Sequence, residues 1–80
     1  TLSASELNFT LEFLNTLSAL DFISSNDIVN LAVKHDQLER YKGTLSMLKH
    51  DGYINNDSEA DKYVFNSPIL KLWWNKNVAN

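Results

Sequence analysis

In the first twenty residues, apolar side chains recur among polar ones at the intervals typical of an amphipathic helix. Ser3 is followed three residues later by Glu6, the spacing of a capping box that satisfies free backbone N–H groups where a helix begins. Leucines then recur every three or four residues, and Phe13 and Leu20 widen the stripe that they form. These leucines are Leu7, Leu11, Leu14 and Leu17. The pattern predicts a helix over residues 4–20.

Two more helices are predicted in the middle of the chain. Ser24, Ser25 and Asn26 interrupt the first pattern and are good N-cap residues. Helical spacing then restarts in a short second helix, which carries Ile28, Leu31 and Ala32.

The third predicted helix spans residues 37–51. Asp36 with Glu39 repeats the cap-box spacing, which makes Asp36 the expected cap, and Gly52 provides a C-terminal stop. One apolar stripe is expected to face the core, and it consists of Leu38, Tyr41, Leu45 and Leu48.

The pattern after Gly52 favours a two-stranded hairpin and a last helix. Tyr53-Ile54 and residues 62–65 favour extended structure, while the acidic stretch 55–61 between them is typical of an exposed loop. Ser67 and Pro68 then form a helix opening, with Ser as the cap and Pro at the first helical position. The apolar face behind this opening consists of Ile69, Leu70, Trp73 and Trp74. This order predicts one mainly helical α+β domain over residues 1–80, a winged helix whose second and third helices form the helix-turn-helix and whose hairpin is the wing.

Composition limits the partners and the compartment. The net charge of −3 and the pI near 5.1 lie far from the basic balance of proteins held to phosphate backbones by charge, so any nucleic-acid contact has to be local. The absence of cysteine excludes disulfides and thiolate zinc sites. No apolar run approaches the roughly 18 residues of a membrane span, and the first residues lack the basic start of a secretion signal. We therefore expect a cytoplasmic domain without membrane contact, and the start at Thr1 leads us to expect a piece of a longer protein.

The motifs of nucleotide and acyl chemistry are missing. Gly43 and Gly52 are the two glycines, and because neither precedes a lysine they form no phosphate loop. The dinucleotide fingerprint needs three glycines, and the hydrolase elbow G-x-S-x-G has no match. The sequence therefore predicts no catalytic or cofactor-binding residue.

The remaining titratable residues have structural explanations. Asp36 as a helix cap and His50 at a helix C-terminus account for the two His-Asp dipeptides without a metal ion. Asp57, Glu59 and Asp61 lie in the predicted loop, where water would keep them ordinary carboxylates. We expect no metal site.

Two partner surfaces can be read from the third predicted helix and from the last one. A face of Arg40, Gly43 and Met47 combines a small dent with a partly apolar surface, which suits a protein partner. Adjacent tryptophans on a helix point about 100° apart, so one of Trp73 and Trp74 should fill the core while the other meets a partner, and Trp74 is included in the candidate surface. The alternative is DNA binding through the third helix, with contacts from Arg40, Lys42, Ser46 and Lys49. The acidic loop makes DNA the less favoured partner.

Two segments carry a family resemblance. Residues 48–54 and 63–74, which read LKHDGYI and YVFNSPILKLWW, resemble the C-terminal winged-helix region of prokaryotic AAA-type ATPases. The chain departs from that pattern at Asn66 and at the lone Lys71, where related chains often carry arginine. The resemblance implies a non-catalytic module that docks to its own ATPase domain or to a protein partner. It implies ATP and Mg²⁺ only for an ATPase domain outside these residues.

Overall fold

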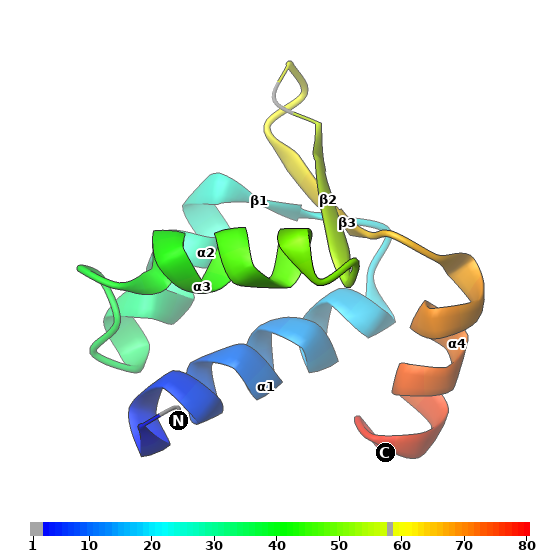
Figure 1. Cartoon of the computed structure of the whole chain (residues 1–80), viewed down its shortest axis with the longest axis horizontal. Helices are drawn as coiled ribbons and strands as arrows, with labels where there is room; N and C mark the ends of the chain where they lie inside the picture. Colours follow the sequence, from blue (N-terminus) through cyan, green and yellow to red (C-terminus); the bar gives the residue numbers. More distant parts are fainter. Residues whose placement is uncertain (1–2, 58) are drawn as a thin grey trace.

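Four helices and a small antiparallel sheet make up the computed structural model, which describes residues 3–57 and 59–80. In chain order the elements are α1 (Ala4–Ala19), β1 (Ile23–Ser24), α2 (Ser25–Lys34), α3 (Tyr41–His50), β2 (Ile54–Asp57), β3 (Lys62–Phe65) and α4 (Pro68–Asn77). The fold is α+β and mostly helical, as predicted. Figure 1 shows α1 along the base of the molecule, the β2–β3 hairpin projecting away from the helices, and α4 beside the C-terminal end of α1.

Helix α1 is the element around which the core is built. It packs against α2, α3, α4 and β3, and the side chains of Phe9 and Phe13 are fully buried with their rings stacked 6.2 Å apart. Ile28 and Ala32 of α2 are also fully buried. The other buried apolar residues are Leu14, Leu17, Ile23, Leu45, Leu48, Ile54 and Phe65.

The cap of α1 at Ser3 is confirmed, and so is the centre of the predicted stripe, where Phe13, Leu14 and Leu17 are buried, whereas the two ends of the stripe are exposed. The Ser3 hydroxyl accepts a hydrogen bond from the Glu6 backbone N–H and donates one to the Glu6 carboxylate. Leu7 and Leu20, expected in the core, are 45% and 47% exposed, whereas Phe9, outside the predicted stripe, is fully buried. The larger ring takes the central position because burying it removes more apolar surface from water.

The prediction that Asp36 caps the third helix is wrong. Asp36 has a φ of +56° and ends α2, with its N–H donating to the Val33 carbonyl while the Gln37 N–H donates to the Ala32 carbonyl. These two bonds form a Schellman motif, in which a left-handed residue closes the helix that precedes it. Helix α3 therefore begins at Tyr41 rather than at residue 37, and its N-cap residue Arg40 forms no side-chain capping hydrogen bond.

This change also moves Leu38 out of the core. Leu38 lies in the turn before α3 and is 53% exposed, while the Gln37 side chain is buried in its place. The predicted stop of α3 is confirmed, because Gly52 has a φ of +86° and the Tyr53 N–H donates to the Leu48 carbonyl. A left-handed φ of this kind favours glycine, which has no Cβ.

The sheet contains three strands where the sequence predicted two. The strand order is β1-β3-β2, with β1 antiparallel to β3. A two-residue strand such as β1 has no recognisable period, and its sequence Ile23-Ser24 leads directly into the N-cap of α2. Strand β2 also runs through Asp57, so part of the predicted loop 55–61 is extended structure, and residue 58 of that loop lies outside the described residues.

The last helix begins where the sequence placed it. The Ser67 hydroxyl accepts a hydrogen bond from the Leu70 N–H, and Pro68 occupies the first turn. Helix α4 packs against α1, where the Trp74 indole N–H donates to the Asn15 side-chain oxygen at 2.8 Å. The Trp74 ring also lies edge-on to Tyr53, with ring centroids 6.2 Å apart.

A cluster of charges joins α1 to the end of α2 and gives the stability a pH dependence. The Glu12 carboxylate accepts hydrogen bonds from Lys34 Nζ at 2.8 Å and interacts with His35 Nε2 at 2.9 Å. The Lys34 and then the His35 hydrogen bond hold the pKa of Glu12 below its ordinary value of 4.5. A carboxyl whose pKa is lower in the folded than in the unfolded chain stabilises the fold above the unfolded pKa, and this contribution disappears as the pH falls through the folded pKa.

We therefore expect Glu12→Gln to destabilise the chain at pH 7 but not at a pH well below 4.5. Urea unfolding of both proteins at several pH values would measure the difference between them. Because Glu12 is about one-third exposed, the effect at pH 7 should be small, below about 1 kcal/mol. A difference that stayed constant down to the lowest pH would contradict this account.

Candidate functional site

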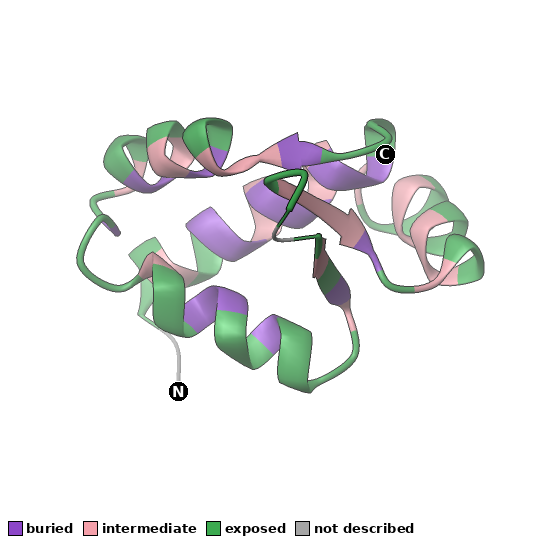
Figure 2. Cartoon of the chain, turned by 90° about the horizontal axis from the view of Figure 1, so that it is seen from above, coloured by how far each residue is buried: buried purple, intermediate pink, exposed green. Residues whose placement is uncertain are grey.

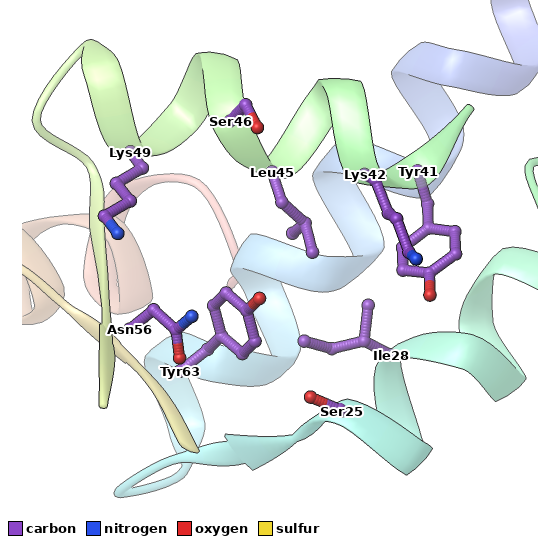
Figure 3. Close-up of a pocket in the computed structure, with 9 residues that line it drawn as sticks. All are labelled: Ser25, Ile28, Tyr41, Lys42, Leu45, Ser46, Lys49, Asn56 and Tyr63. Carbon is purple, nitrogen blue, oxygen red and sulfur yellow. The ribbon is translucent and has the colours of Figure 1, made fainter. Parts of the chain in front are cut away.

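A cleft lies between α3 and the face of the sheet. Its volume is about 320 Å³, and it is lined by Ser25, Ile28, Tyr41, Lys42, Leu45, Ser46, Lys49, Asn56 and Tyr63. Figure 3 shows α3 along one side of this α3–sheet cleft, with Ser25 and Ile28 from α2 and Asn56 and Tyr63 from the hairpin opposite it. The cleft is therefore assembled from segments distant in the sequence.

Polar side chains from both walls reach this cleft. Lys42, Ser46 and Lys49 are separated by four and three residues, which places them on one face of the helix. On the hairpin, Asn56 and Tyr63 are paired in the register of β2 and β3, so their side chains lie on the same face of the sheet. In Figure 3 the Lys49 side chain extends toward Asn56, and the Lys42 side chain lies beside Tyr41.

The charged side chains that line the cleft are both lysines, although the chain as a whole is acidic and the Asp61 carboxylate at the edge of the cleft accepts a hydrogen bond from Ser25. Among the described residues, no carboxylate lines the cleft. In the described residues, the side chains of Lys42, Ser46, Lys49 and Asn56 form no hydrogen bond and no ion pair. By contrast, Lys34 pairs with Glu12. The cleft thus offers free hydrogen-bond donors beside two cations.

Tyr63 contributes a hydroxyl and a half-buried aromatic ring to the cleft. Burial raises the pKa of the Tyr63 phenol, and the neighbouring Tyr41 and Asp61 groups raise it further. The phenol therefore keeps its proton near neutral pH and can donate a hydrogen bond. Ser25, at the edge of the cleft, donates to the Asp61 carboxylate.

Helix α4 presents a second candidate surface, made only of apolar side chains. Ile69, Leu72 and Trp73 are 80%, 72% and 54% exposed, and their spacing places them on one face of the helix. We call these three residues the α4 ridge. No residue of α4 is buried, and Figure 2 shows the helix in the colours of intermediate and exposed residues.

The predicted protein-partner residues come from two elements, α3 with its N-cap Arg40 and α4. Gly43 and Met47 are exposed on α3, where a Cβ at Gly43 would meet no atom within 4 Å. The Arg40 guanidinium lies 3.6 Å from the Glu6 carboxylate of α1 and borders a different hollow, lined by Ser3, Ser5, Asp36, Gln37, Leu38, Glu39 and Arg40. Trp74 packs toward the core, and it is Trp73 that faces outward. The expected division between the two tryptophans is found, with Trp74 partly buried on the core and Trp73 54% exposed, so the candidate surface named the less exposed of the two.

The predicted nucleic-acid contacts are divided in the same way. The structure brings Lys42, Ser46 and Lys49 together in the α3–sheet cleft and leaves Arg40 outside it. The sequence reasoning missed Ser25 of α2, and it missed Asn56 and Tyr63, which the pairing of β2 with β3 brings to the cleft. The alternation of side chains along residues 62–65 could have placed Tyr63 on a sheet face, but no local signal connects it with α3.

The described residues contain no group of three or more His, Asp or Glu side chains placed to hold a metal ion. In the same residues, no helix has the length and apolar character required to cross a membrane. Gly43 lies within α3 and Gly52 in the turn after it, so neither forms the glycine-rich loop that an ATP phosphate chain would need. A scan against models of protein families, a search of curated proteins and a search of solved structures each gave no match to this chain.

Proposed function

We propose that the chain is a winged-helix domain that acts as a non-catalytic interaction module of a larger AAA-type ATPase. In this proposal the α4 ridge docks onto the ATPase domain of the same protein. The element order, with α2 and α3 ahead of the hairpin, supports the winged-helix assignment. The resemblance of residues 48–54 and 63–74 supports the link to an ATPase.

The observation that carries the proposal is the exposure of the α4 ridge. A helix with apolar residues on opposite sides is normally buried on both sides. Helix α4 uses Leu70 and Trp74 to pack on the domain, while Ile69 and Leu72 remain more than two-thirds exposed. Anchors spaced by three and four residues are the ones that an amphipathic helix inserts into the groove of a protein partner.

The charges near the ridge indicate what kind of groove would receive it. Helix α4 carries Lys71 and Lys76 and no acid, while all ten acidic residues of the chain lie in residues 1–61. A second copy of α4 would bring like charges together, which is unfavourable. An apolar groove with acidic residues along its rim would complement the helix, so a neighbouring domain suits the ridge better than self-association.

We expect Ile69→Glu and Leu72→Glu to weaken docking to the ATPase region by roughly thirtyfold or more, because each places a charge in an apolar contact. The region of the parent protein that precedes this chain would be produced separately, and its binding measured by calorimetry. Val33→Glu is the matched control, since Val33 is 60% exposed on α2 and should leave binding unchanged. All three variants should unfold at the same urea concentration as the unmodified chain.

Two results would overturn the proposal. One is a preceding region without a glycine-rich phosphate loop, which would remove the ATPase link. The other is binding that survives both glutamate substitutions, which would place the docking surface elsewhere. If the two glutamate substitutions instead abolish binding to a different protein, the chain is still an interaction module, but its partner is that protein.

DNA binding through α3 is the alternative function. It has support in the shared helix face of Lys42, Ser46 and Lys49, and less in Arg40, which is engaged with Glu6. Tight, salt-sensitive binding of duplex DNA that is lost on Arg40→Ala would favour this alternative.

A further inference from the structure

We infer that the α3–sheet cleft binds single-stranded nucleic acid, with one base inside the cleft and a phosphate at each end of it. This inference is independent of the proposed docking of α4, because α4 contributes no residue to the lining of the cleft. It rests on the spacing of the two lysines, the nature of the floor and the free donors on both walls.

The spacing of the lysines fits two phosphates. Lys42 and Lys49 are seven residues apart on one face of α3, which separates their backbones by about 10 Å along the helix axis. In Figure 3 one side chain lies beside Tyr41 and the other reaches toward Asn56, so their ammonium groups lie toward opposite ends of the cleft. A single phosphate group at one end could satisfy one lysine only, whereas consecutive phosphates along a strand can reach both.

The floor between the lysines is suited to a base. Ile28 and Leu45 are buried beneath it, and the half-buried ring of Tyr63 lies beside them. A volume of about 320 Å³ is at the lower end of the range for ligand sites. One planar heterocycle in contact with a tyrosine ring suits such a space, and stacking on aromatic side chains is the usual way in which proteins hold unpaired bases.

The free donors complete the complementarity. Lys, Ser, Asn and Tyr side chains are the groups that commonly contact phosphate and sugar oxygens. Ser46 and Asn56 from opposite walls have no partner among the described residues, and the protonated Tyr63 phenol adds a third donor. An acidic peptide would pair with the lysines, but it would place no planar group on the apolar floor of the cleft.

The hairpin favours one strand over two. A base can enter the cleft only when it is unpaired, and Asp57 and Asp61 at the end of the hairpin would repel the backbone of a second strand. A single strand following α3 keeps its phosphates at the lysines, on the wall of the cleft opposite Ser25 and its partner Asp61.

The test is a fluorescence-anisotropy titration of a labelled ten-nucleotide oligothymidylate with the intact chain at several salt concentrations. We expect the logarithm of the association constant to fall against the logarithm of the salt concentration with a slope of about −1.4, as two phosphate contacts on a single strand require. The double variant Lys42→Gln/Lys49→Gln should bind roughly tenfold more weakly or worse and lose most of that slope. Both lysines are exposed, so the variant should remain folded, which circular dichroism would verify.

The control variant is Lys34→Gln/Lys76→Gln. It removes the same charge from two exposed side chains of α2 and α4 outside the lining of the cleft, so it should bind like the unmodified chain. Equal loss of binding in this control would overturn the inference, as would tighter binding of a duplex of the same length. Displacement of the strand by polyglutamate or by thymidine monophosphate at equal concentration would also overturn it, because neither presents a base between two phosphates.

Discussion

Phe13→Ala is expected to lower the free energy of unfolding by about 3–5 kcal/mol, the range for removing a large aromatic side chain from a core. Phe13 is fully buried and stacked on Phe9 in the helix that contacts most other elements. A chain of 80 residues has a total stability of roughly 4–12 kcal/mol, so this one substitution should remove a large part of it. Urea unfolding followed by circular dichroism would measure the change.

Leu7→Ala is the matched control, because Leu7 belongs to the stripe that the sequence predicts for the same helix. Its side chain is 45% exposed, so we expect a loss of less than about 1 kcal/mol. Equal effects of the two substitutions would contradict the burial of Phe13 and the exposure of Leu7 described for α1.

Trp74→Ala is the substitution with the second largest expected effect, a loss of about 2–3 kcal/mol in the free energy of unfolding. The ring lies 6.2 Å from Tyr53 and 6.3 Å from Phe65, between centroids, and its N–H donates to Asn15. The change therefore removes apolar packing and leaves a half-buried amide oxygen without its donor. The loss is below the upper range for tryptophan because Trp74 is only partly buried.

Two further substitutions separate the contributions at this position. Trp74→Phe keeps an aromatic ring but removes the N–H donor, and should cost about 1 kcal/mol. Trp73→Ala changes a side chain that is 54% exposed, and should change the stability by less than about 0.5 kcal/mol. The same urea titrations apply, and a larger effect at Trp73 than at Trp74 would contradict the packing described for α4.

The sequence was sufficient for features that depend on neighbouring residues. The capping of α1 by Ser3, the stop at Gly52 and the start of α4 at Ser67 and Pro68 were all predicted and are found. Each is a contact between residues within a few positions of one another, so the local sequence contains both partners.

The one incorrect cap shows the limit of this reasoning. Asp36 has the composition and spacing of a helix start, yet it ends the preceding helix. A short polar residue suits an N-cap and also tolerates a left-handed conformation. In the structure the N–H groups of Asp36 and Gln37 bond to the carbonyls of Val33 and Ala32, and Ala32 is fully buried, so the residue closes α2 instead of starting α3.

The sequence predicted only the α3 side of the candidate site. Helical spacing placed Lys42, Ser46 and Lys49 on a shared face, and they share the α3–sheet cleft. Spacing also predicted Arg40 as a fourth contact, but the side chain turns to Glu6, a residue more than thirty positions earlier. The periodicity of a helix specifies which of its residues are neighbours and says nothing about the side chains opposite them.

By itself, the sequence determined a mainly helical α+β chain, the caps that begin and end most of its helices, and the missing motifs of nucleotide and acyl chemistry. Only the tertiary structure decided that Phe9 belongs to the core, that Trp73 rather than Trp74 faces outward, and that Asn56 and Tyr63 lie opposite α3. The physical reason is the range of the interactions concerned. Capping and helical periodicity act over a few residues, whereas burial and the pairing of β1, β3 and β2 depend on contacts between segments distant in the chain.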